Sequence, residues 1–162
     1  RLGKSVFIDE CCYIHACKNG VHIGDYSKIM RGAVLHVHNF RDEKQSGIWI
    51  GKNCYIADFA LIRGQGGTRI GDNVLISPYV SIFPSNHNYK DTSKPKNQQG
   101  ITSKGITIED DVWIGANSVI TDGVTIHKGA VIGAGSVVTE SIPAYTIAAG
   151  NPCKVLRRIE SP

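Results

Sequence analysis

The feature that most constrains this chain is a period of six residues in its apolar side chains. The period is most regular in the second half, at Ile108, Ile114, Ile120, Ile126, Ile132 and Val138. The first half repeats it in three shorter runs: Ile23, Ile29 and Leu35; Ile50, Ile56 and Ile62; Ile70, Ile76 and Ile82. A helix needs a period of about 3.6, and an ordinary hairpin sheet has no reason to repeat at six.

Each group of six residues can supply one short strand and one corner. The residue two positions before each apolar mark is small or β-branched, as at Ser27, Ala60 and Val112. Because side chains alternate along a strand, both positions point to the same, inward face. Glycine often follows the mark, as at Gly51 and Gly115, and it tolerates a tight corner. Three units close a triangular coil, and stacked coils form a solenoid in which each coil stabilises its neighbours.

Two segments leave the period. A loop from about residue 84 to 105 begins in "SIFPSNHNYKD" and has His87 near its start, among polar residues. The tail "AAGNPCKVLRRI" contains Pro152, and we expect it to fold back as a terminal cap with a short helix. Loops on a rigid scaffold are where binding and catalytic groups tend to lie. His87 is therefore a candidate functional residue, although a lone loop histidine is more often a surface residue.

Composition narrows the class of protein. The 162 residues are enough for one domain with a real core, so we expect a single domain over 1–162. No apolar run approaches the roughly eighteen residues of a membrane span, and no charged-then-apolar leader opens the chain. A net charge of +4 suits an anionic ligand better than a nucleic-acid surface. We expect a cytoplasmic protein with no membrane span and no nucleic-acid partner.

The cysteines and a histidine pair have plain interpretations. Cys12 and Cys54 occupy inward small-residue positions, and five cysteines without a C-x-x-C pair favour reduced, space-filling thiols. The role of Cys153 stays open. His36 and His38 lie on one side of an expected strand and could supply two metal ligands, but a third must come from elsewhere. We expect no metal site.

Taken in order, several stretches resemble the hexapeptide-repeat acyltransferases, closest to sugar O-acetyltransferases of the galactoside, maltose and polysaccharide-modifying type. They are the repeat, "SNHNYKD", "ITIEDDVWIGANSVITDGVTI", "VIGAGSVV" and the tail, which together cover nearly the whole chain. The resemblance implies an all-β fold, a left-handed parallel β-helix with one protruding loop (about 84–105) and a short C-terminal cap. It also implies a homotrimer with active sites in grooves between subunits, with acetyl-CoA as co-substrate and no metal.

The resemblance also assigns roles to residues. His87 matches the general base, which takes a proton from a sugar hydroxyl so that its oxygen attacks the thioester directly, without a covalent enzyme intermediate. A backbone N–H near Ala116 is the expected oxyanion donor. The cofactor-binding set is Trp113, Ala116, Ala134, Ser136, Thr139, Lys154 and Arg157. The acceptor-binding set is Asp58, Arg63, Asn86 and Tyr89.

Two departures from these relatives leave the acceptor open. Galactoside-type relatives carry a lysine where this chain has Glu140, and an asparagine in the stretch here reading "ADFALIRG". Asp58 or Arg63 would have to replace that asparagine. The alternatives are N-acetylation of an amino or nucleotide sugar, O-acetylation of a xenobiotic, and a longer acyl donor.

Two further classes are more distant. A gamma-class carbonic anhydrase-like metal enzyme would recruit His36, His38 and His87. Against it, the Arg-Gly-Asp stretch of that family reads Arg31, Gly32, Ala33 here, and the H-x4-H spacing is absent. A non-catalytic β-helix acting as an assembly subunit would leave His87 and the tail without a role.

Overall fold

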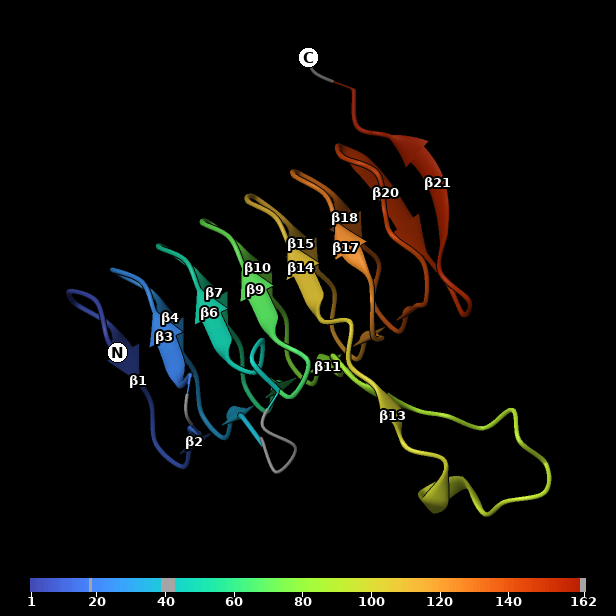
Figure 1. The fold of residues 1–162 in the computed structure, drawn as a ribbon. Helices are drawn as coiled ribbons and strands as arrows, with labels where there is room; N and C mark the ends of the chain where they lie inside the picture. Colours follow the sequence, from blue (N-terminus) through green and yellow to red (C-terminus); the bar gives the residue numbers. More distant parts are fainter. Residues whose placement is uncertain (18, 39–42, 161–162) are drawn as a thin grey trace.

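The computed structural model describes residues 1–17, 19–38 and 43–160. The chain winds into a left-handed parallel β-helix, as the sequence predicts. Figure 1 shows the coils stacked along one axis, with short strands at equivalent places in successive coils. The register follows the repeat, because Ile76 is the partner of Ile56 in the preceding coil and of Ile114 in the following one.

Three sheets form the sides of the β-helix. The five-stranded sheet contains β3 (Val21–Ile23), β6 (Ile48–Ile50), β9 (Thr68–Ile70), β14 (Ile106–Ile108) and β17 (Thr125–Ile126). The eight-stranded sheet contains β1 (Phe7–Ile8), β4 (Lys28–Ile29), β7 (Tyr55–Ile56), β10 (Leu75–Ile76), β15 (Trp113–Ile114), β18 (Val131–Ile132), β20 (Thr146–Ala149) and β21 (Lys154–Arg158). The six-stranded sheet contains β2 (Tyr13–His15), β5 (Val34–His36), β8 (Leu61–Arg63), β11 (Ser81–Ile82), β16 (Val119–Ile120) and β19 (Val137–Val138).

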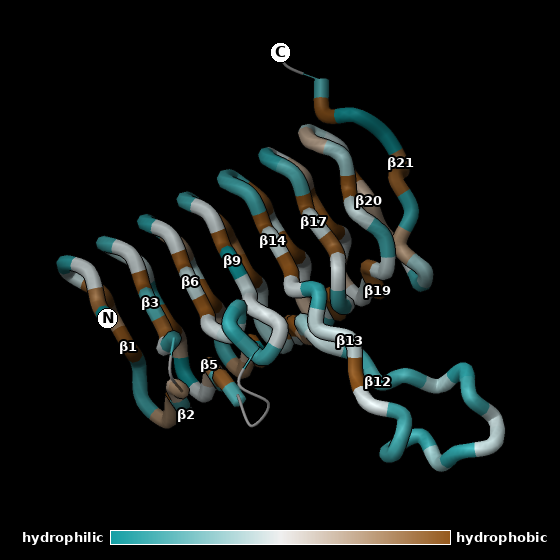
Figure 2. The backbone as a smooth tube through the Cα atoms, in the orientation of Figure 1, coloured by the Kyte–Doolittle hydropathy of each residue, from teal (hydrophilic) through white to brown (hydrophobic). Residues whose placement is uncertain are grey.

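The apolar marks of the repeat form the core inside the coils. The largest fully buried side chains are Ile29, Leu35, Ile48, Ile56, Ile62, Ile76, Ile82, Ile108, Ile114, Ile120, Ile126 and Ile132. Figure 2 shows brown, hydrophobic stretches that recur in successive coils, against a mostly teal protruding loop. The small inward positions are buried as well, Ala60 and Cys54 among them. Fully burying one aliphatic side chain contributes about 1.5–3 kcal/mol, so the repeated columns dominate the stability of the stack.

The first coil is an exception to this burial. Ile8 and Ile14 lie at marks of the repeat but remain 36% and 40% exposed. The cause is position, since the first coil has a neighbouring coil on one side only. For the same reason Cys12 is only partly buried, whereas Cys54 in an inner coil is buried.

The C-terminal tail corrects one expectation. It folds back on the last coil as predicted, but it does so as the strand β21, which pairs antiparallel with β20, rather than as a short helix. The edge of a sheet presents unpaired N–H and C=O groups, and an extended tail satisfies them along its length. Cys153, in the turn before β21, is buried, and its N–H donates to the carbonyl of Val137.

The long interruptions leave the β-helix at one corner, between the six-stranded and the five-stranded sheet. One lies between β5 and β6, and the protruding loop lies between β11 and β14. The protruding loop carries β12 (Asn86–His87), the short 3-10 helix η1 (Lys96–Gln98) and β13 (Ile101–Thr102), and extends away from the stack in Figure 1. Within the described ranges, no helix is long and apolar enough to cross a membrane.

Candidate active site

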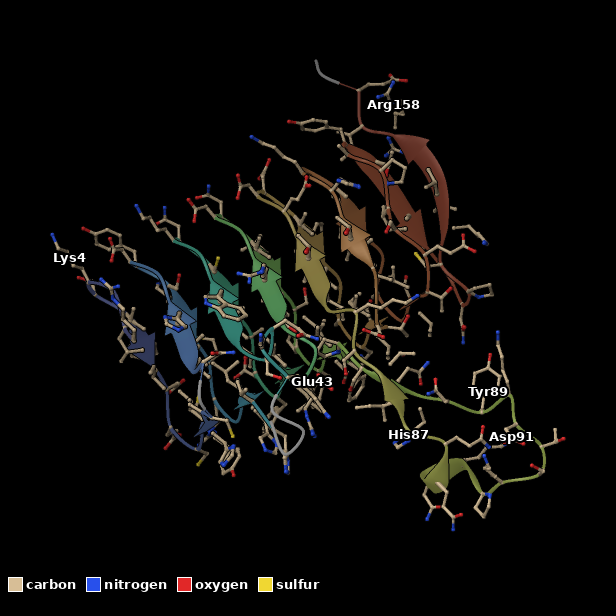
Figure 3. The ribbon with its side chains drawn as sticks, viewed as in Figure 1. Lys4, Glu43, His87, Tyr89, Asp91 and Arg158 are labelled. Atoms are coloured by element: carbon tan, nitrogen blue, oxygen red, sulfur yellow. The ribbon has the colours of Figure 1, made fainter. Side chains whose placement is uncertain are left out.

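His87 lies on a small antiparallel ladder at the base of the protruding loop. In β12 it is the register partner of Ile101 in β13, and Asn86 is the partner of Thr102. The N–H of Asn88 donates to the carbonyl of Gly100 at 3.0 Å and extends the ladder by one bond. The His87 side chain is exposed, and Figure 3 shows it on the loop beyond the stacked coils. The backbone is therefore fixed while the imidazole is free to contact a ligand.

The protruding loop encloses a polar hollow beside this histidine. Its volume is about 570 Å³, and its lining includes Asn86, His87, Tyr89, Lys90, Asp91 and Lys94. An ion pair of 3.3 Å joins Lys94 to Asp91, and hydrogen bonds from Ser93 lower the pKa of the Asp91 carboxyl. Hydroxyl-rich ligands suit such a lining, which offers amide, phenol, cationic and anionic groups.

The base of the loop is braced by Glu43 and Gln45, which shortly precede β6. Gln45 donates from Nε2 to the carbonyl of Ser103 at 3.2 Å. The Ser103 hydroxyl donates to Oε1 of Glu43 at 3.1 Å. At the other side of the base, a β-carbon on Gly66 would overlap the carbonyl oxygen of Pro84. One end of the loop is thus held by residues shortly before β6, and the other packs closely against Gly66.

Trp113 points outward from β15, as the sequence predicts. Its side chain is 50% exposed, and its indole N–H donates to Oγ of Ser77 at 3.1 Å. It lies in register between Leu75 and Val131 on the outer face of the eight-stranded sheet. Half of the Trp113 side chain is therefore exposed, between two apolar neighbours.

The two predicted alanines lie at successive corners of the β-helix. The carbonyl of Ala116 accepts a hydrogen bond from the N–H of Gly135 at 2.8 Å, so Ala134 lies beside it in the next coil. Ser136 differs, because it is fully buried and its hydroxyl donates to the carbonyl of Gly133. The Ser136 side chain is turned into the coil interior and is unavailable to a cofactor, which leaves only its main chain for that role.

The remaining members of the cofactor-binding set lie near the C-terminal end. Thr139 is exposed after β19, and Arg157 is exposed on β21 opposite Ile147. Lys154 forms an exposed ion pair of 3.4 Å with Glu140. This acid therefore contacts one of the two cations expected to face phosphate groups.

The acceptor-binding set divides into two places. Asn86 and Tyr89 line the hollow with His87. Asp58 lies at a corner between β7 and β8, and Arg63 ends β8. Neither of these two residues lines the hollow, so a single chain does not bring all four together.

His36 and His38 lie close together as expected, with ring centroids 5.1 Å apart, although β5 ends at His36 and His38 follows the strand. The structure adds His15, whose ring centroid lies 4.9 Å from that of His36. Burial, followed by the charges of Arg63, His15 and His38, lowers the pKa of His36. Among the residues that the structure describes, no three His, Cys, Asp or Glu side chains are arranged to hold a metal ion.

Sequence reasoning missed the residues that organise the loop. Gln99 crosses its interior with three hydrogen bonds, and Gln45 and Ser103 brace its base. Polar side chains in a loop follow no period, so the sequence carries no signal that separates these residues from solvated neighbours such as Asn97.

Comparisons with known proteins bear on this site. The family model described as "Bacterial transferase hexapeptide (six repeats)" matches residues 105–140. The galactoside O-acetyltransferase of Escherichia coli (strain K12) is 45% identical over 115 residues, which are 70% of this chain and 55% of that protein. The chain spans about half the length of the curated relatives it matches.

Two acetyltransferases are among the solved structures that match over 98% of the chain. The maltose O-acetyltransferase from Clostridium difficile 630 is 30% identical, with a TM-score of 0.63 and 69% of its own chain covered. The hexapeptide-repeat containing acetyltransferase VCA0836 from Vibrio cholerae O1 biovar eltor, complexed with acetyl coenzyme A, is 29% identical, with a TM-score of 0.65 and 70% covered.

Proposed function

This chain belongs to the hexapeptide-repeat acetyltransferase family, and we propose that it transfers an acetyl group from acetyl-CoA to a hydroxyl of a sugar or saccharide. The observation that carries the proposal is the exposed imidazole of His87 on a fixed ladder beside a polar hollow. The galactoside and maltose acetyltransferases support the acceptor class, and the acetyl coenzyme A complex supports the donor. The proposal covers residues 1–162 as one catalytic domain acting in the cytoplasm.

His87 acts as the general base in this proposal. Its imidazole accepts the proton of an acceptor hydroxyl, and the oxygen attacks the thioester carbonyl directly. The tetrahedral oxyanion is stabilised by a backbone N–H near Ala116. Collapse of the intermediate breaks the carbon–sulfur bond and releases the CoA thiolate, which takes the proton from His87. The products are the acetylated acceptor and free CoA thiol, and no metal takes part.

The donor lies along the later coils in this proposal. The small side chains of Ala116 and Ala134 leave room for the pantetheine arm at successive corners, and Trp113 and Thr139 border it. Lys154 and Arg157 face the nucleotide phosphates, where cations are favourable. The ion pair between Lys154 and Glu140 weakens this attraction, because the carboxylate already satisfies part of the ammonium.

The proposal includes a homotrimer with the active sites between subunits. An apolar stripe supports association, since the outward residues Tyr55, Leu75 and Trp113, on adjacent strands of the eight-stranded sheet, are 37%, 49% and 50% exposed. A contiguous apolar stripe of this kind marks interaction surfaces. A groove between subunits could also bring Asp58 and Arg63 of one chain to the hollow of another, which one chain alone does not do.

A thiol-release screen with acetyl-CoA tests the function. The panel holds free sugars, oligosaccharides, amino sugars and a nucleotide sugar, and mass spectrometry of each product separates O-acetylation from N-acetylation. We expect release with a neutral sugar or saccharide and an ester product. Release only with amino acceptors, giving an amide product, would replace the O-acetyl assignment by the N-acetyl alternative. No release with any member of the panel would contradict the proposed function.

A further inference from the structure

Gln99 holds the interior of the protruding loop with one side chain. Its Nε2 donates to the carbonyl of Asp91 at 2.6 Å and to the carbonyl of Lys94 at 2.8 Å. Its Oε1 accepts the N–H of Asp91 at 3.0 Å. Both amide hydrogens and the amide oxygen therefore have partners on the opposite strand of the loop.

The main chain of Gln99 lies at the end of the ladder that carries the proposed base. Its carbonyl accepts Nδ2 of Asn88 at 3.0 Å. The carbonyl of the next residue, Gly100, accepts the N–H of Asn88. Two residues after Gln99, Ile101 is the register partner of His87. Gln99 thus connects two parts of the loop. Its side chain binds the segment from Asp91 to Lys94, and its main chain binds Asn88, the residue after His87.

One other side chain crosses the loop: Lys96 donates from Nζ to the carbonyl of Tyr89 at 2.8 Å, but this single exposed contact does not reach the ladder strand β13. The residues from 86 to 98 are exposed apart from the partly covered Asp91, so apolar burial does not order the segment. A two-stranded ladder is marginal in water on its own, and this one joins no further strand, although its two ends are anchored in the coils. The His87 imidazole has no hydrogen bond to any residue in the described ranges, so the place of its ring is restrained only through the backbone beneath it. Figure 3 shows His87, Tyr89 and Asp91 around this loop.

We infer that Gln99 is a positioning residue for His87: its cross-loop amide fixes the ladder that aims the imidazole into the hollow. This inference rests on the proposed function, because the consequence measured first is a rate of acetyl transfer. Gln99 also lines the hollow, but its amide nitrogen and oxygen are all engaged within the loop, so we assign it a positioning role rather than a catalytic one. It acts through the segment from Asp91 to Lys94 and through the Asn88 hydrogen bonds.

The test replaces Gln99→Glu, which keeps the size of the side chain but removes both amide donors and places a carboxylate against two carbonyl oxygens. Gln99→Met removes the hydrogen bonds without adding charge. The matched control is Asn97→Asp, the same change from amide to acid at an exposed position of η1. Full-length protein is used, with the acceptor from the screen and a melting temperature for each variant.

Both Gln99 variants should lose about tenfold or more in kcat, because a small misplacement of a catalytic group is costly. The KM for acetyl-CoA should stay within about twofold of the control, because the later coils hold the donor. Amide hydrogen exchange should accelerate at Asn88 and Asp91 in both variants but not in Asn97→Asp. A kcat within twofold of the control, or unchanged exchange at both amides, would overturn the inference.

A second readout separates this inference from the proposed function. If the wild type acetylates no acceptor, the function fails, and positioning is judged from the imidazole resonances of His87. A displacement of those resonances in both Gln99 variants, absent in Asn97→Asp, would support positioning without any reference to activity. Identical resonances in all three variants would contradict it.

Discussion

His87 and Ile101 are register partners in an antiparallel ladder that belongs to none of the three sheets of the β-helix. The ladder is nevertheless anchored at both ends, because Ile82 precedes it and Ile106 follows it, and both are buried in adjacent coils. The stacked coils thus hold β12 and β13 side by side. The exposed imidazole of His87 lies on β12. The interruption of the repeat therefore places an exposed histidine next to the stacked coils.

Self-association is the first expectation. We expect light scattering at micromolar concentration to give three times the chain mass of 17.6 kDa. Leu75→Glu should lower that mass, because it places a charge in the middle of the apolar stripe. Thr107→Glu, on the outer face of the five-stranded sheet, is the control and should leave it unchanged. A wild-type mass equal to one chain would rule the trimer out.

The close packing of Gly66 predicts that a larger residue there displaces the base of the protruding loop. In Gly66→Ala the new methyl group would overlap the Pro84 carbonyl, so the base of the loop must shift. Overpacking of this kind costs roughly 1–3 kcal/mol. Gly135→Ala is the comparison, because a β-carbon there meets nothing within 4 Å and the variant carries only the strain of a φ of +70°. Hydrogen exchange across residues 84–105 should rise in Gly66→Ala alone, and equal exchange in the two variants would refute the packing argument.

The cysteines should react in order of exposure. Cys11 is exposed and should be alkylated first in the folded protein, with the partly buried Cys12 slower. Burial raises the pKa of the Cys54 thiol, which lowers the thiolate fraction, so Cys54 should stay unmodified. Cys54→Ser should be tolerated better than Cys54→Phe, since overpacking costs roughly 1–3 kcal/mol. Mass spectrometry of labelled peptides gives the order, and rapid native labelling of Cys54 would show that its inward assignment is wrong.

The histidine cluster predicts acid sensitivity. Because the pKa of His36 is lowered in the folded state, the unfolded chain binds the proton more readily. This contribution therefore weakens stability as pH falls through the ordinary histidine value of about 6.5 towards the lower folded value. The melting temperature of the wild type should drop more between pH 7.5 and 5.5 than that of His36→Asn. His127→Asn, at a surface pair with Glu109, is the control. An equal drop in wild type and His36→Asn would contradict this account.

The sequence predicted the parts of the fold that the period controls. Ile56, Ile76 and Ile114 are buried in register because each repeats the same strand and corner. The exposure of Ile8 and Ile14 could not be read from the same period, because it depends on the missing neighbour of an end coil. The tail strand was missed because the free edge of β20, a tertiary feature, decided its conformation. The break in the period indicated His87 but not Gln99. The role of Gln99 depends on hydrogen bonds to carbonyls that come close to its amide only in the folded loop.

The most direct measurement of the central claim is the turnover of His87→Ala against a verified acceptor, with acetyl-CoA affinity and melting temperature measured on the same samples. The fold should be intact, because the exposed imidazole contributes nothing to the buried isoleucine columns. Acetyl-CoA affinity should be nearly unchanged, because the later coils and the tail hold the donor in our proposal. Turnover should fall by about 10²–10⁴, the usual contribution of a positioned general base. Near-normal turnover in a variant that melts with the parent would show that His87 is not the base.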